Sequence, residues 1–260
     1  MYLGVANQLV LIKCAFCGFV FLVNAPPINY NKEYLGSESV LTEGNELALF
    51  RANERLASIA RYVLPGPDRR FLDIGIGDGL LLSLAEKINY TTFGLDVNAD
   101  GVEIARKQYG LKAEISILPL DQAFPDSSFD VIHMNEVIEH IPQPRYLLHW
   151  CRKHLRKGGC LVIQTGNIDS LASQIQGIDW DYIRPVHCSY FSSKSLKWAV
   201  EKAKFKIVCR RTVDWRFFPA LRVANVLIRQ AGWLRSLRFL FLYLTAIPFG
   251  LRRSIIIYAR

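Results

Sequence analysis

The sequence predicts an α/β domain that is built on a mostly parallel β-sheet with helices on both faces. From about residue 46 to residue 213, runs of helical periodicity alternate with short runs rich in β-branched and aromatic residues, an alternation that is typical of βαβ units. The chain has 260 residues, of which 51% are hydrophobic, and this is enough to bury one full core. We therefore expect one main domain with short additions.

The first 44 residues are expected to form an N-terminal hairpin and loop segment. Val, Ile and Phe dominate residues 9–23 and Gly18 permits a bend, which predicts two short strands around a tight turn. Cys14 and Cys17 have the spacing of a zinc knuckle, but a closed structural site needs four ligands, so zinc is not expected. The other four cysteines fall in predicted regular structure and no basic stretch precedes the apolar start. We expect neither a disulfide framework nor a cleaved targeting segment, and a reducing cytoplasm fits best.

The elements of the main domain follow in order. Residues 46–63 carry apolar side chains near helical spacing and Pro65 stops the run, which predicts a helix. The next predicted elements are a strand at 71–74, a helix at 79–88, a strand at 92–96, a helix at 99–108, strands at 113–117 and 130–135, a helix at 146–155 and a strand at 160–165. A helix at 195–203 and strands at 205–212 and 254–259 complete a core that we place at residues 45–213 and 254–260.

A glycine-rich loop lies where the first predicted strand of this core gives way to a helix. The loop reads Asp-Ile-Gly-Ile-Gly-Asp-Gly over residues 73–79. Glycines there allow the backbone to approach a ligand closely, and the helix N-terminus adds oriented N–H groups. A dinucleotide-binding fingerprint requires glycine at position 80, where this chain has Leu80. The spacing therefore argues against a dehydrogenase.

Ionisable side chains follow two further predicted strands. Asp96 ends the next strand, 23 residues after Asp73, where it could hold both ribose hydroxyls of an adenosyl ligand. Glu136, Glu139 and His140 follow a later strand at spacings i, i+3 and i+4, which on a helical turn places all three side chains on one face. Such a group could deprotonate a hydroxyl or amine, or could bind a divalent cation that polarises the acceptor.

These segments, in this order, resemble the motifs of class I S-adenosylmethionine-dependent methyltransferases. The resemblance covers roughly residues 45–213, and its matching stretches are residues 73–79, 94–96, 129–132, 136–141 and 155–159. It implies a Rossmann-like fold with a seven-stranded sheet whose last strand is antiparallel, and S-adenosylmethionine as the cofactor. The residues that it places beside this cofactor are Asp73, Gly75, Gly77, Gly79, Asp96, Val97 and Asn135.

The chain departs from this family's pattern after the third strand. The family usually has an acidic residue near the adenine, and the direct alignment puts Leu118 there. Asp121 is the nearest carboxylate, and we keep it as a candidate for cofactor binding. A solvated position in a loop is an equally weighted alternative for Asp121.

The cluster at residues 136–140 also resembles the metal site of small-RNA 2′-O-methyltransferases and a matching signature in ubiquinone-pathway O-methyltransferases. His187 would complete a metal site with Glu136, Glu139 and His140. Many relatives carry this signature without a metal role. A catalytic or substrate-orienting role of His140 is therefore an alternative to binding of a divalent cation. The N-terminal layout resembles a subfamily of sugar and polysaccharide pathways that begins with two cysteine pairs, of which the first is absent here.

Residues 214–253 form a predicted insertion with seven arginines and one acid. Its apolar run at 239–247 is too short to span a bilayer and is closed by Pro248. Two readings of this basic, aromatic helical pair have equal weight: peripheral contact with the inner membrane face, or a cap that packs on the domain or covers the acceptor site.

The net charge of +9 favours an acidic partner. Our leading hypothesis is methyl transfer to a small, lipid-linked or sugar-like acceptor, with oxygen as the expected acceptor atom. The alternatives are RNA 2′-O-methylation and a non-catalytic cofactor-binding module at a membrane surface. Nucleic acid is the less favoured partner because no appended RNA-binding motif is present.

Overall fold

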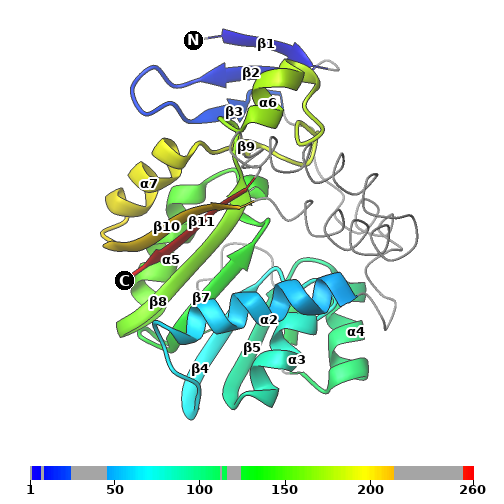
Figure 1. The fold of residues 1–260 in the computed structure, drawn as a ribbon, viewed down its shortest axis with the longest axis vertical. Helices are drawn as coiled ribbons and strands as arrows, with labels where there is room; N and C mark the ends of the chain where they lie inside the picture. The colour runs from blue at the N-terminus through cyan, green and yellow to red at the C-terminus, as the bar shows by residue number, and fades with distance from the viewer. Residues whose placement is uncertain (1, 7–8, 25–45, 112, 116–123, 214–253) are drawn as a thin grey trace, which may run out of the picture.

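The central feature of the molecule is a seven-stranded sheet in the strand order β10-β11-β8-β7-β4-β5-β6. The computed structural model describes residues 2–6, 9–24, 46–111, 113–115, 124–213 and 254–260, shown in colour in Figure 1. Neighbouring strands from β8 to β6 run parallel, and β11 is antiparallel to both β8 and β10. The predicted fold class is confirmed. The strands are β4 (Gly66–Ile74), β5 (Tyr90–Asp96), β6 (Ala113–Ile115), β7 (Phe129–Asn135), β8 (Leu155–Gly166), β10 (Ile207–Val213) and β11 (Ser254–Ala259).

Helices cover both faces of this sheet (Figure 1). One face carries α2 (Glu46–Ala60), α3 (Leu80–Lys87) and α4 (Ala99–Tyr109), and the other carries α5 (Pro144–His154) and α7 (Ser193–Lys202). Each face buries its own apolar cluster, with Phe71 and Val131 on the α2 side and Leu72 and Ile132 on the α5 side. Because the central strands are buried on both faces, their sequences read as almost continuous apolar runs.

The ends of helices α4 and α7 are formed by capping residues that the sequence supplies at those positions. The Asn98 side chain accepts hydrogen bonds from the backbone amides of Asp100 and Gly101 at the start of α4, which Gly110 ends with a φ of 66°. Ser192 and Ser195 form a capping box at the start of α7. These caps fix the predicted helices to within a few residues of the expected bounds.

A second, four-stranded antiparallel sheet consists of β1 (Tyr2–Ala6), β2 (Leu9–Lys13), β3 (Val20–Leu22) and β9 (Ser189–Tyr190). The predicted hairpin is β2 and β3, with Gly18 at a φ of 74° in its turn. Cys14 and Cys17 lie in that turn, and within the described residues no group of three metal-ligating side chains includes them. The predicted N-terminal segment is thus paired through β9 with residues far along the chain.

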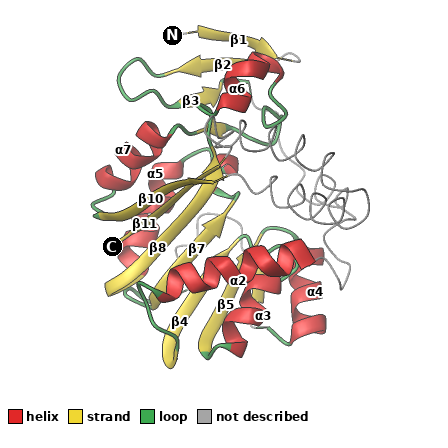
Figure 2. Ribbon diagram, viewed as in Figure 1, coloured by secondary structure: helices red, strands yellow, loops and turns green. Residues whose placement is uncertain are grey.

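The segment between β8 and α7 holds elements that the sequence did not predict. They are the short helix α6 (Leu171–Gln176), labelled in Figure 2, the 3₁₀ turn η2 (Gly177–Asp179) and β9, labelled in Figure 1. No helix in the described ranges is long and apolar enough to cross a membrane. The predicted insertion at 214–253 and Asp121 lie outside the described residues.

Candidate functional site

The three glycines of the loop between β4 and α3 have two different roles. Gly75, Gly77 and Gly79 all have positive φ values, of 79°, 56° and 85°. A Cβ on Gly75 would lie 2.3 Å from Val137 Cγ2, and a Cβ on Gly79 would lie 2.9 Å from the Ala105 Cβ. No atom lies within 4 Å of a Cβ placed on Gly77, which is exposed. Gly75 and Gly79 are therefore required by packing, whereas Gly77 leaves an open backbone face that a ligand can approach.

Asp96 links this loop to the end of β5. Its Oδ2 accepts a hydrogen bond from the Gly77 amide at 3.1 Å, and its Oδ1 accepts one from the Asn98 amide at 2.9 Å. Burial raises the pKa of Asp96, while the amides of Asn98 and Gly77 oppose that shift. Asp96 and the adjoining Val97 are partly exposed. The predicted residues of two loops thus meet at the carboxyl edge of the sheet, where α/β sheets bind ligands.

Asp73 is buried in the sheet beneath this loop. Its Oδ1 lies 2.6 Å from His133 Nδ1, on the neighbouring strand β7 at the same register position. Burial lowers the pKa of His133 and outweighs the opposing effect of Asp73. A neutral His133 therefore donates its Nδ1 hydrogen to the Asp73 carboxylate.

Arg55 on α2 reaches the same edge of the sheet, although the sequence analysis did not select it. Its guanidinium donates to Asn135 Oδ1 at 3.1 Å and to Gln164 Oε1 at 2.9 Å. Burial lowers the pKa of Arg55, and the nearby Asp73 and Glu136 oppose this shift. A signal was present, because Arg55 interrupts the apolar stripe of α2. Asn135, a predicted site residue, is thereby fixed in place.

The turn after β7 differs from the predicted helical face. Glu136 has a φ of 53° and its amide donates to the Gln164 carbonyl of β8, so it lies outside the 3₁₀ turn η1 (Ile138–His140). The expectation that Glu136, Glu139 and His140 share one helical face is wrong. The physical reason is that the Glu136 backbone is still bound to the sheet.

Tyr182 instead brings the two glutamates together. Its hydroxyl lies 2.7 Å from Glu136 Oε2, contacts Glu139 Oε1 and accepts a hydrogen bond from the Gly166 amide at 2.9 Å. A hydroxyl has one hydrogen, so it can donate to only one of the two carboxyl groups, and the other must be protonated. Burial and the neighbouring Glu139 raise the pKa of Glu136 well above its ordinary value. Glu136 therefore holds the shared proton, and Tyr182 donates to Glu139.

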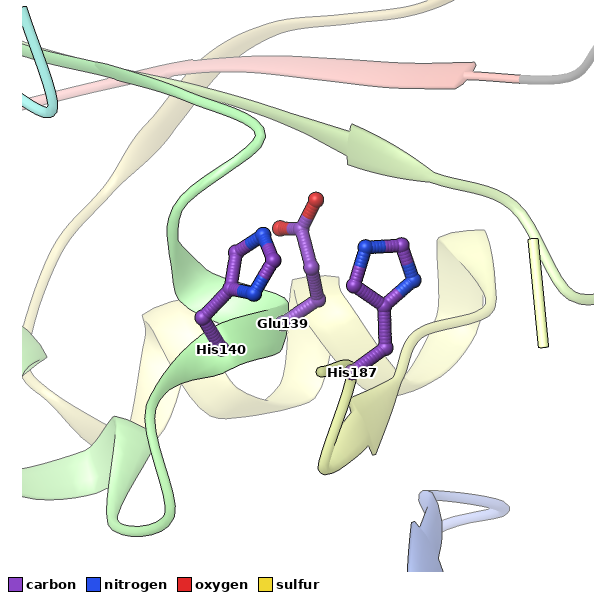
Figure 3. A group of neighbouring side chains, drawn as sticks. All are labelled: Glu139, His140 and His187. Atoms are coloured by element: carbon purple, nitrogen blue, oxygen red, sulfur yellow. The ribbon is translucent and has the colours of Figure 1, made fainter. Parts of the chain in front are cut away.

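Three of the predicted metal ligands do converge. Ligand atoms of Glu139, His140 and His187 lie within 4.8 Å of one another, all three residues are buried, and Glu139 lies between the two imidazoles in Figure 3. The Nδ1 atoms of His140 and His187 lie 2.9 Å and 2.7 Å from the carbonyl oxygens of Val186 and Tyr182. Those contacts place a ring hydrogen on Nδ1 of each imidazole, so a metal ion or a proton would be bound at Nε2. Glu136 is not part of this group.

Burial and the proximity of His140 lower the pKa of His187 to about 3. At neutral pH His187 is therefore uncharged, which is the form that binds a metal or accepts a proton. The site joins the uncharged His187 and the adjacent His140 to a carboxyl pair that shares a proton, so it can accept a proton or bind a cation. Within the described residues, this site and the glycine loop share the same edge of the sheet.

Comparison with known proteins gives one family match and many relatives. A family model described as a methyltransferase domain matches residues 47–210. The ubiquinone biosynthesis O-methyltransferase of Erwinia tasmaniensis is 28% identical over 148 residues, which cover 54% of this chain and 60% of that protein. The protein of the same name from Cereibacter sphaeroides is 34% identical over 123 residues, covering 45% and 50%. The chain thus spans about half of the length of these curated relatives.

Solved structures share the fold at low sequence identity. A SAM dependent methyltransferase from Archaeoglobus fulgidus has a TM-score of 0.60 at 21% identity, covering 89% of this chain and 99% of that one. The [4+2]-cyclase SpnF has a TM-score of 0.55 at 19% identity, covering 81% of each chain. These likenesses show the fold alone, and the second shows that one fold carries different reactions.

Proposed function

This chain belongs to the methyltransferase-domain family, and we propose that it transfers a methyl group from S-adenosylmethionine to a hydroxyl group of a small, lipid-linked or sugar-like acceptor. The observation that carries the proposal is the open backbone face at Gly77 beside the Asp96 carboxylate. Ubiquinone biosynthesis O-methyltransferases among the relatives support oxygen as the acceptor atom. Contact with a membrane through residues 214–253 rests on the sequence alone.

The residues at this edge fit an adenosyl sulfonium. Asp96, whose carboxylate is oriented by the Gly77 and Asn98 amides, offers its oxygens to the ribose hydroxyls, and the open backbone face at Gly77 lets the ligand approach closely. The Arg55 guanidinium, held between Asn135 and Gln164, supplies the positive charge that a methionine carboxylate requires. When bound, the sulfonium supplies an already activated methyl group. The task of the protein is therefore alignment of the acceptor and removal of its proton.

We assign proton removal to His140. Its Nδ1 is fixed against the Val186 carbonyl, and we assign proton uptake to its other ring nitrogen, Nε2, because the imidazole lies beside Glu139 and His187. Glu136 and Glu139 share a proton through Tyr182 and form a second position for a proton from the acceptor. A base of this kind contributes most when its pKa lies near the working pH.

A divalent cation at Glu139, His140 and His187 is a second candidate for the same step. The grouping of one carboxylate and two imidazoles within 4.8 Å favours it. Mixed nitrogen and oxygen donors suit Zn²⁺, Mn²⁺ or Fe²⁺ better than Mg²⁺. Dialysis against a chelator, followed by metal analysis and addition of each cation, tests this candidate. Acceptor-dependent turnover that is unchanged by chelation assigns the step to His140 alone.

The proposed function is tested by calorimetry and by release of S-adenosylhomocysteine. We expect Asp96→Ala to weaken binding of S-adenosylmethionine by at least about tenfold, as loss of charge-assisted hydrogen bonds predicts. Asp100→Ala is the matched control, because Asp100 is an exposed carboxylate in the first turn of α4. Equal binding by the two variants would contradict the cofactor site. Tight binding without release of S-adenosylhomocysteine from any acceptor pool would contradict the transfer.

A further inference from the structure

A separate cavity of about 480 Å³ lies on the α5 and α7 face of the molecule. It is lined by the turn between β2 and β3, the first turns of α5, and α7, which lie close together in Figure 1. None of its lining residues belongs to the candidate functional site. Its volume falls within the range of about 300–1,000 Å³ that small-molecule pockets occupy.

Four aromatic side chains line this cavity. Phe19 and Phe191 pack against each other with ring centroids 5.1 Å apart, and Tyr146 and Trp198 also line the cavity. Phe16, which is 80% exposed, packs edge-on against Trp198 at the outer margin. Apolar surface dominates the interior, so an occupant gains most by burying an apolar body there.

The rim of the cavity carries the positive charge of Arg145. Arg145 and His149 are exposed lining residues on α5, and none of the described lining residues is Asp or Glu. Among the described residues, Arg145 forms no ion pair. The mouth also lies at the N-terminal end of α5, the positive end of its helix dipole. Charge complementarity therefore favours an anionic group at the rim.

The lining elements exclude one common type of partner. The lining residues belong to turns and helices and to an isolated bridge at Phe191, and none lies in a described strand. An extended peptide could not add a strand here. A single small molecule that fills the hollow is the occupant that the walls favour.

We propose that this cavity binds one amphiphile, a long-chain carboxylate whose apolar chain lies against Phe19, Phe191 and Trp198 and whose carboxylate meets Arg145 and His149. The apolar walls favour the hydrocarbon part of this ligand, and the charge at the rim favours a long-chain carboxylate over the matching long-chain alcohol. The proposal is independent of methyl transfer, because the cavity and the candidate site share no residue. The cavity is thus a second ligand site, on a different face of the sheet from the α2 helix.

The test is titration of the full chain with a fluorescent long-chain carboxylate, parinarate, below its micelle concentration. We expect saturable binding of one molecule per chain. Arg145→Ala should weaken the binding of the carboxylate by about fivefold, as one exposed charge pair predicts, and leave the matching alcohol unchanged. Lys153→Ala is the control, because Lys153 is exposed on the same helix and does not line the cavity.

A second pair of variants fills the cavity. Ala199→Phe places a ring inside it, and Gln143→Trp covers it from an exposed position whose side chain makes no capping hydrogen bond. Either variant should abolish parinarate binding while S-adenosylmethionine binds as before. The proposal is overturned if parinarate does not saturate, if it still binds the folded Gln143→Trp variant, or if only anionic vesicles and not dispersed parinarate bind.

Discussion

Removal of one hydroxyl, in Tyr182→Phe, tests how the carboxyl pair of the candidate site is held. The hydroxyl accepts from the Gly166 amide and from protonated Glu136, and it donates to Glu139. The ring remains in place because it stacks on Trp180 and lies against Gly166. The variant therefore loses hydrogen bonds with almost no change in packing.

The expected loss in the free energy of unfolding is about 3 kcal/mol. Hydrogen bonds to charged groups contribute about 1.5–3 kcal/mol, and a buried donor left unsatisfied costs about 1–3 kcal/mol, with partial overlap between the two effects. For a chain of this size, that loss lowers Tm by about 6–12 °C. Urea denaturation at fixed pH measures the free energy directly.

The loss should grow with pH. The hydrogen bond from Tyr182 lowers the pKa of Glu139, whereas burial raises it above its ordinary value of 4.5. A carboxyl group whose pKa is raised on folding contributes stability below pH 4.5, and this stability is lost as pH rises through the folded pKa. Without the hydroxyl, the folded pKa rises further. Tyr182→Phe is therefore expected to differ least from the wild type at acid pH and most at alkaline pH.

Tyr190→Phe is the matched control. Tyr190 is also buried and lies in the same segment, but among the described residues its hydroxyl makes one hydrogen bond, at 3.3 Å, to the Arg184 carbonyl. This variant should lose no more than about 1 kcal/mol, with no dependence on pH between about 5 and 8. Equal losses in the two variants, or a flat difference with pH for Tyr182→Phe, would refute the shared-proton arrangement.

Three further predictions follow from the site. Gly75→Ala should lower the free energy of unfolding by about 3 kcal/mol or more because its Cβ would lie 2.3 Å from Val137, whereas Gly77→Ala should lower it by only about 1 kcal/mol and yet bind S-adenosylmethionine poorly. Urea denaturation measures the two stabilities and calorimetry measures the binding, and equal stabilities would contradict this contrast. His140→Ala should abolish acceptor-dependent turnover and leave the affinity for S-adenosylmethionine within about twofold, and a wild-type rate would remove His140 from the mechanism. The pKa of His187 is lowered from 6.5 to about 3, so this residue contributes stability above pH 6.5 that is lost as pH falls toward 3. His187→Gln should make the free energy of unfolding less dependent on pH between about 3 and 6.5, and an unchanged dependence would count against a buried neutral imidazole.

The fold could be predicted because its signals are local. Buried parallel strands give apolar runs, amphipathic helices give a 3.6-residue period, and Pro65 marks the end of α2 to within a few residues. The short elements between β8 and α7 gave no such signal. The two residues of β9 form a strand only because they pair with β3, and this contact joins positions almost 170 residues apart.

The site could be predicted in part for the same reason. Asp96 and the glycine loop follow the carboxyl ends of two parallel strands, and such ends meet at the same edge of a sheet, so their proximity could be expected from the order of the strands. Arg55 and Tyr182 reach their partners from 80 and 46 residues away in sequence, at Asn135 and Glu136. Spacing alone also misplaced Glu136, since a period of 3.6 cannot show that its backbone is still bound to β8. Long-range contacts are what the single sequence did not reveal.

The pairing of β3 with β9 has a consequence for how this chain could diversify. The glycine loop depends on the large sheet, whereas the segment that carries Tyr182 and His187 leads directly into β9 of the small one. Substitutions in the N-terminal hairpin can therefore shift these two side chains and leave the Asp96 loop untouched. Selection for a new acceptor can act on one scaffold while the other keeps its inherited ligand.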